Sequence, residues 1–157
     1  MRNSIVLLAA VGLLMIAGVG QADTVTSGTL THEVDVTQYN TRVDTLDWLS
    51  DASGNVVATL TGVRGTIKRI VINPDDGATS PTASYDMTLT DQDGVDLLGG
   101  LGANVSASAT TDFPSVTTDS ASSTTVPRPT VGDLDLAITN AGAANGGIVR
   151  VFLRREY

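Results

Sequence analysis

The sequence predicts an all-β protein, a single β-sandwich or jelly-roll-like domain of about eight strands that follows an apolar N-terminal segment. Three observations lead to this fold class. Thr, Ser, Gly, Asp and Val dominate the composition, and these residues favour strands and turns over helices. Short runs of alternating apolar and polar residues recur, with turn-forming residues between them at intervals of roughly 8–12 residues. The 157 residues suffice for one domain with a real core, and no internal repeat or second domain is visible.

Residues 1–22 have the three parts of a secretory signal peptide. Arg2 supplies a positive charge, residues 5–19 are apolar or small, and a small–x–small ending places the cleavage point after Ala22. About fifteen helical residues span about 22 Å, less than the roughly 30 Å hydrocarbon core of a membrane. Cleavage is therefore favoured, with a retained membrane or virion-embedded anchor and a plain buried segment as alternatives. Membrane contact is expected only through residues 5–19, and the β-domain comprises residues 23–157.

The first strand of this domain is predicted within residues 24–37. From Thr29 onward apolar and polar residues alternate, which is the pattern of a half-buried strand. A polar break at residues 38–42 ends it. The apolar face of this strand would carry Leu30, His32, Val34 and Val36.

Two further strands and two turns are predicted next. Residues 43–49 alternate again, and residues 50–55 contain Asp, Gly and Asn, which predict a hairpin turn. Residues 56–61 would then be the return strand. Residues 62–65 begin and end in glycine and predict another turn. The inward face of the 43–49 strand would carry Leu46 and Trp48.

The middle of the chain is predicted to form the centre of the sheet. Residues 66–72 are an apolar run typical of a central strand, and residues 73–81 are a turn-forming loop. Residues 84–90 have the clearest alternation in the chain. A tight turn at residues 91–94 would lead into a third strand at residues 95–98. The inward face of the 84–90 strand would carry Tyr85, Met87 and Leu89.

The rest of the chain predicts a long loop and a final pair of strands. Residues 106–130 contain 13 Ser or Thr and predict either a surface loop carrying short strands or a partly ordered arm. Residues 134–139 and 148–154 alternate like strands, on either side of a Gly/Ala/Asn loop at 140–147. Their inward faces would carry Leu134, Leu136 and Ile138, and Val149, Val151 and Leu153.

Charge and cysteine content exclude several function classes. The chain has 17 acidic and 9 basic residues, a net charge of −8, so it repels phosphate backbones and no nucleic-acid partner is expected. It contains no cysteine, which excludes disulfides and thiolate metal sites. No basic residue occurs between Arg69 and Arg128, so that half of the domain should have an acidic surface.

The residues capable of chemistry form no complete catalytic pattern. His32, the single histidine, falls on an apolar strand face without a G-x-S-x-G elbow and is expected to be structural. Asp91, Asp93 and Asp96 predict either a turn capped by carboxylates or a calcium site, although their spacing differs from an EF-hand. A hydrolase built on paired aspartates is disfavoured because sugar-cleaving clefts also need aromatics, which make up 4% of the chain. No catalytic residue, cofactor or metal ligand is assigned.

Several runs in residues 60–155 resemble small β-rich structural proteins of tailed phages. These runs are residues 65–77 with Pro81, residues 85–98 with the 102–104 segment, and residues 134–142 and 147–154. The resemblance implies a virion component, either a capsid decoration or a head or tail accessory protein. It also implies an oligomer whose partners are its own copies and a capsid or tail lattice protein.

The function expected from these observations is that of a non-enzymatic virion structural protein, located in the virion and needing no cofactor. The alternative is an exported bacterial surface or periplasmic β-sandwich binding module, secreted or periplasmic after cleavage following Ala22. The first rests on the all-β pattern and the resemblance, and the second on residues 1–22.

Overall fold

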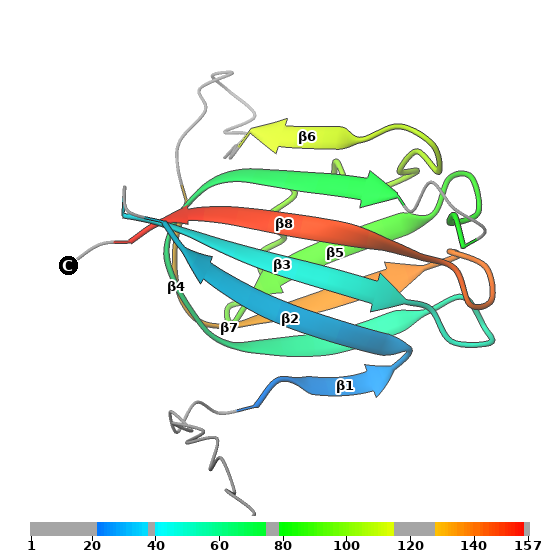
Figure 1. Ribbon diagram of the computed structural model, residues 1–157, viewed down its shortest axis with the longest axis horizontal. Helices are drawn as coiled ribbons and strands as arrows, with labels where there is room; N and C mark the ends of the chain where they lie inside the picture. Colours follow the sequence, from blue (N-terminus) through cyan, green and yellow to red (C-terminus); the bar gives the residue numbers. More distant parts are fainter. Residues whose placement is uncertain (1–21, 38–39, 75–78, 115–127, 156–157) are drawn as a thin grey trace, which may run out of the picture.

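The computed structural model describes residues 22–37, 40–74, 79–114 and 128–155, and it confirms the all-β prediction (Figure 1). These residues form eight antiparallel strands joined in one sheet, and they contain no helix and hence none that could span a membrane. The strands are β1 (Thr24–Ser27), β2 (Thr29–Val36), β3 (Thr41–Leu49), β4 (Val56–Pro74), β5 (Asp86–Asp91), β6 (Thr111–Pro114), β7 (Arg128–Thr139) and β8 (Gly146–Arg154).

The sheet folds over itself at β4, which is 19 residues long and curves around one end of the molecule (Figure 1). The first half of β4 pairs with β1 and β7, and β7 continues to β5. The second half pairs with β8 and β6, and β8 continues to β3 and β2. The two halves of the sheet therefore form two layers that share β4, which accounts for the sandwich pattern in the sequence.

The predicted turn at residues 62–65 is wrong, because β4 continues through it. The pairing with β7 shifts register between Leu60 and Val63, so the strand bulges and bends without reversing. Gly62 has φ +66° and Gly65 has φ +139°, conformations that side-chain-bearing residues rarely adopt. A Cβ on Gly65 would also lie 2.5 Å from the backbone oxygen of Arg154. Glycine here lets the strand turn the corner between the layers.

Residues 50–55 form a turn as predicted, but the hairpin is wrong. Asp51 accepts hydrogen bonds from the backbone N–H groups of Ser53 (2.8 Å) and Asn55 (2.9 Å), which fixes the turn. The strands on either side do not pair with each other, since β3 pairs with β2 and β8 while the start of β4 pairs with β1 and β7. The turn therefore carries the chain from one layer to the other.

The predicted strand at residues 95–98 is also wrong, since only Asp96 forms a bridge, to Thr90. The Asp96 carboxylate accepts from the N–H groups of Leu98 (3.0 Å) and Gly100 (2.7 Å), so the backbone turns instead of extending. The segment nevertheless buries Leu97 and Leu98 in the core. It also covers the outer edge of β5, as Leu97 N–H donates to Leu89 O and Met87 N–H to Gly102 O, both at 2.7 Å.

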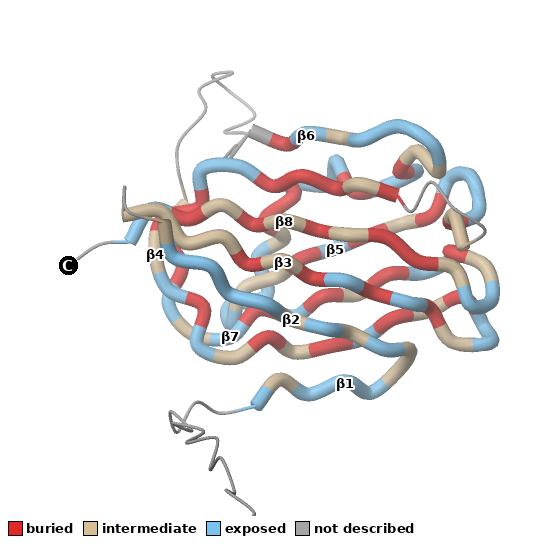
Figure 2. Tube along the Cα trace, in the orientation of Figure 1, coloured by how far each residue is buried: buried red, intermediate tan, exposed pale blue. Residues whose placement is uncertain are grey.

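The predicted inward faces of β3, β5, β7 and β8 are confirmed, and they meet in one core (Figure 2). Trp48 of β3 lies against Tyr85, next to β5, with ring centroids 5.8 Å apart, so this pair joins the two layers. Strand β2 differs from the prediction, because Val34 and Val36 are 51% and 50% exposed although Leu30 packs against the core.

Three predicted features fall partly or wholly outside the described residues. Of the signal peptide or anchor at residues 1–22, only Ala22 is described. Of the 73–81 loop, residues 75–78 lie outside. Of the 106–130 segment, residues 115–127 lie outside, and the described parts contain β6 and the start of β7.

Candidate functional site

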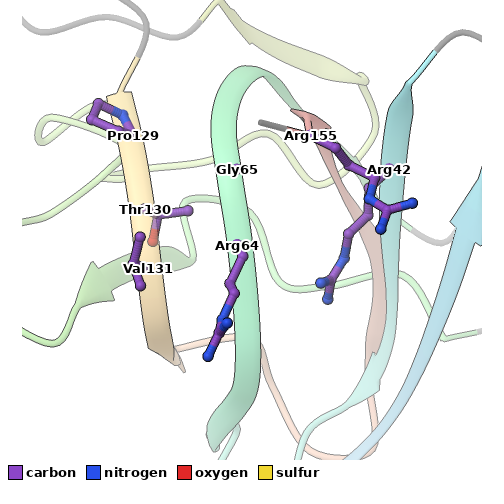
Figure 3. A pocket seen from close by; sticks show the side chains of 7 residues that line it. All are labelled: Arg42, Arg64, Gly65, Pro129, Thr130, Val131 and Arg155. Carbon is purple, nitrogen blue, oxygen red and sulfur yellow. The ribbon is translucent and has the colours of Figure 1, made fainter. Parts of the chain in front are cut away.

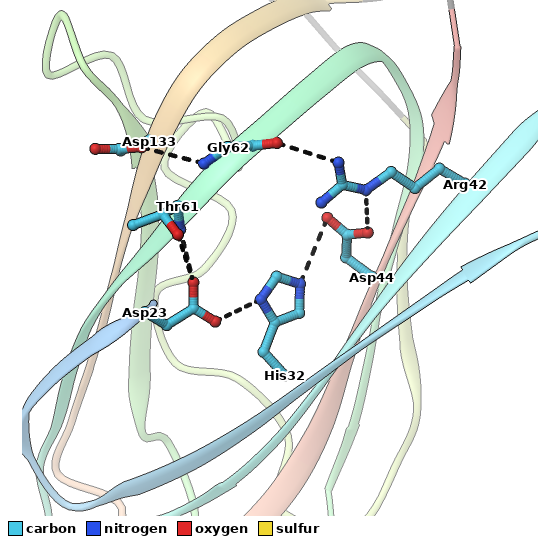
Figure 4. Close-up of polar contacts among 7 residues, drawn as sticks. All are labelled: Asp23, His32, Arg42, Asp44, Thr61, Gly62 and Asp133. Carbon is cyan, nitrogen blue, oxygen red and sulfur yellow. Dashed lines mark hydrogen bonds and ion pairs between the residues drawn. The ribbon is translucent and has the colours of Figure 1, made fainter. Parts of the chain in front are cut away.

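His32 lies at the centre of a polar cluster that joins strands from both layers (Figure 4). Its Nδ1 is 2.6 Å from an oxygen of Asp23, and its Nε2 is 3.6 Å from Oδ2 of Asp44. Asp23 accepts a hydrogen bond from the Thr61 N–H at 2.7 Å, and Arg42 Nε donates to Asp44 at 2.6 Å. We call these five residues the His32 clamp, because they connect β2 to β3, to β4 and to the residue preceding β1.

The clamp places both ring nitrogens of His32 against carboxylates. A general-base histidine needs one ring nitrogen on a carboxylate and the other on the group that it deprotonates. Here both ring nitrogens face carboxylates, and no hydroxyl group of the described residues bonds to Nε2. With His32 protonated, two positive groups oppose Asp23 and Asp44. The structural role expected for His32 from the sequence stays a prediction.

The carboxylate of Asp44, together with that of Asp23, raises the pKa of His32 above its ordinary 6.5, against the lowering effect of burial. A pKa raised on folding adds stability that is complete below pH 6.5 and is lost as pH rises through the folded-state value. The free energy of unfolding should therefore fall as pH rises above about 6.5 in the wild type and stay flatter in His32→Gln. Urea unfolding across this range measures it, and parallel profiles for the two proteins would contradict the assignment.

The loop with Asp91, Asp93 and Asp96 uses its carboxylates as backbone caps. Asp91 Oδ1 accepts from the N–H groups of Asp93 (3.0 Å) and Val95 (2.9 Å), and Asp96 caps the next turn. Within the described ranges, no group of three or more acidic or histidine side chains is placed to hold a metal ion. Of the two interpretations that the sequence left open, the geometry matches the capped turn.

A pocket of about 400 Å³ opens beside the bend of β4 (Figure 3). Three arginines reach it from different strands: Arg42 from β3, Arg64 from β4 and Arg155 just after β8. Residues 129–131 of β7 and Gly65 complete the wall, and among the described residues no acidic side chain lines it. Because Arg42 is paired with Asp44, the positive charge here that has no ion-pair partner among the described residues comes from Arg64 and Arg155, in a chain whose net charge is −8.

The sequence did not predict most residues of the His32 clamp and of the arginine-lined pocket. Asp44 and Arg42 alternate in phase with Leu46 and Trp48, so two charged residues on an inward strand face were the available signal for the His32 clamp. Arg64 lay in a segment expected to be a turn, and nothing local placed it near Arg155. Neither the family models nor the curated proteins with which the sequence was compared match this chain.

Proposed function

We propose that this protein is a non-enzymatic structural component of a phage virion, assembling as an oligomer on a capsid or tail. The observation that carries the proposal is the open edge of β2. This strand has eight residues and, among the described strands, hydrogen-bonds only to β3. An unpaired strand edge is a template to which another chain can add a strand.

The remaining strand edges within the described residues are less suited to the addition of a strand from another chain. β1 and β6 have four residues each, and β1 has a register shift in its pairing. The outer edge of β5 is covered by the 96–105 segment. β2 contains neither proline nor lysine, two of the residues that commonly protect an edge; its charged or ionisable residues are His32, Glu33 and Asp35, and it exposes Val34 and Val36.

The His32 clamp supports the same function, because it holds this edge in place. Through His32, strand β2 is fixed to Asp23 and Asp44, and through Asp23 to β4. A pre-ordered edge binds an incoming strand with less loss of conformational entropy than a frayed one. The hydrogen bond of His32 Nδ1 to Asp23, with Nε2 facing Asp44 at 3.6 Å, also favours a structural over a catalytic role.

We expect Val34→Lys to weaken binding to the particle by at least about tenfold, because a lysine on an exposed edge strand disfavours the addition of another strand. Purified variants would be added to particles lacking the protein, and the bound fraction measured by co-sedimentation. Val57→Lys is the matched control, since Val57 is 42% exposed but lies in the interior strand β4. Equal binding by both variants would show that β2 does not contact the particle. Failure of the wild-type protein to bind particles would contradict the proposed function.

A second candidate, an exported binding module, is favoured by the position of Asp23. Cleavage after Ala22 would make Asp23 the first residue, and its side chain is already bound to His32 and Thr61 of the folded domain. The domain would thus keep the His32 clamp after cleavage. The intact mass of the chain from periplasmic and particle fractions separates the two candidates.

A further inference from the structure

Residues 129–131 of β7 form a ridge between two hollows at the bend of β4. The arginine pocket, with Arg42, Arg64 and Arg155, lies on one flank. A second hollow of about 250 Å³ lies on the other flank, lined by Asp91, Gln92 and Asp93. Both hollows share the 129–131 segment as a wall, and we call this segment the β7 ridge.

The ridge is apolar at its crest. Val131 is 65% exposed, the largest value among the exposed large apolar residues of the described chain, and Pro129 is exposed as well. An exposed apolar crest with charged flanks has the composition of a contact surface, with an apolar centre and a polar rim.

Each flank offers one charged group that is free to pair. Arg64 is exposed and forms no ion pair with any described residue. Asp93 is exposed too, and its carboxylate accepts no hydrogen bond from the described residues, whereas that of Asp91 caps the backbone. The surface therefore has an unsatisfied positive side and an unsatisfied negative side.

We propose that the β7 ridge is a twofold interface with a second copy of this chain. A twofold axis running along the ridge brings Val131 of the two copies together and places Arg64 of each opposite Asp93 of the other. Such an interface is self-complementary, as closed dimers require. The inference specifies one of the self-contacts of the proposed oligomer and so rests on that function.

Charge explains why this surface selects its partner and its orientation. Two copies that each carry a net charge of −8 repel each other in most orientations. Rotation about an axis across the ridge would oppose arginine to arginine, which is costly. Only the axis along the ridge aligns opposite charges on both flanks, so the flanks fix the register while the apolar crest supplies contact area.

The test uses charge reversal and measures the dimer dissociation constant by sedimentation velocity on the full-length protein as produced. Arg64→Asp and Asp93→Arg should each weaken the homodimer more than about tenfold, because each places like charges across both contacts. Mixing these two variants should form a heterodimer of near wild-type affinity, since both opposite-charge contacts return. The Arg64→Asp/Asp93→Arg double variant should recover its homodimer for the same reason.

Matched controls are Lys68→Asp and Asp47→Arg, which reverse exposed charges that line neither hollow and should leave the dissociation constant within about twofold. Failure of the mixed variants to associate, or unchanged affinity in both single variants, would overturn the interface. A monomeric wild type that still binds particles would overturn the interface and leave the proposed function standing. A dimer with this charge dependence that never binds particles would support the interface and contradict the proposed function.

Discussion

Asp44→Ala lowers the free energy of unfolding by about 3–5 kcal/mol, the cost of removing one partner from a buried ion pair. The Asp44 side chain is 1% exposed, and it faces Arg42 Nε at 2.6 Å and His32 Nε2 at 3.6 Å. Without it, the Arg42 guanidinium loses its carboxylate partner and His32 keeps only Asp23. Urea unfolding at pH 7 measures the loss.

The control for this variant is Asp47→Ala, on the same strand but on the exposed face. Asp47 has no ion pair with the described residues, so its removal should change the free energy of unfolding by less than about 0.5 kcal/mol. A loss below about 1 kcal/mol for Asp44→Ala would mean that the His32 clamp does not hold β2 to the domain.

Trp48→Ala should lower the free energy of unfolding by a similar amount, about 3–5 kcal/mol, for a different reason. Trp48 is 1% exposed and packs against Tyr85 between the two layers, so its removal leaves a cavity where the layers meet. Since small domains have total stabilities of about 5–15 kcal/mol, this variant should be near the limit of folding. Thermal unfolding followed by circular dichroism measures it.

Two conservative variants test whether packing is the cause. Tyr85→Phe keeps the ring, and the Tyr85 hydroxyl bonds to none of the described residues, so the change should stay within about 1 kcal/mol. Burial of this group also raises the pKa of Tyr85 to about 12, so it is uncharged at neutral pH. Trp48→Phe should lie between wild type and Trp48→Ala. A mild effect of Trp48→Ala itself would show that the layers are held together elsewhere.

The alternation in the sequence predicted the fold class and most of the core, because a half-buried strand marks its inward face locally. Leu134, Leu136 and Ile138 are all 0% exposed, as their spacing indicates. The pattern could not decide which strands pair with each other, because strand pairing depends on residues far apart in the sequence. Gly62 and Gly65 predict a turn by composition, but β8 passing beside Gly65 shows that they serve a bend in a continuous strand.

The site was harder to predict than the fold, since each cluster is assembled from separate strands. The His32 clamp joins Asp23, His32, Asp44 and Thr61, and no local spacing relates them. The exposure of Val34 has the same origin: its alternation is correct for an inward face, but β2 lies at the edge of its layer, so the residue is 51% exposed.

In this protein, polar contacts fix the conformation of the strands and loops that form its exposed surfaces. The His32 clamp orders the β2 edge, the aspartates of the 91–96 loop cap turns, and the bend of β4 positions the β7 ridge. In this account assembly involves two distinct surfaces, the β2 edge toward the lattice protein and the β7 ridge toward a second copy.

The most direct test of this account is quantitative mass spectrometry of purified, salt-washed phage particles, with the copies of this chain counted against the major capsid protein. We predict a fixed ratio that is reproduced across preparations, as expected of a component bound at repeated lattice positions. Absence of the chain from the particles, with recovery in the periplasmic or culture fraction instead, would contradict it.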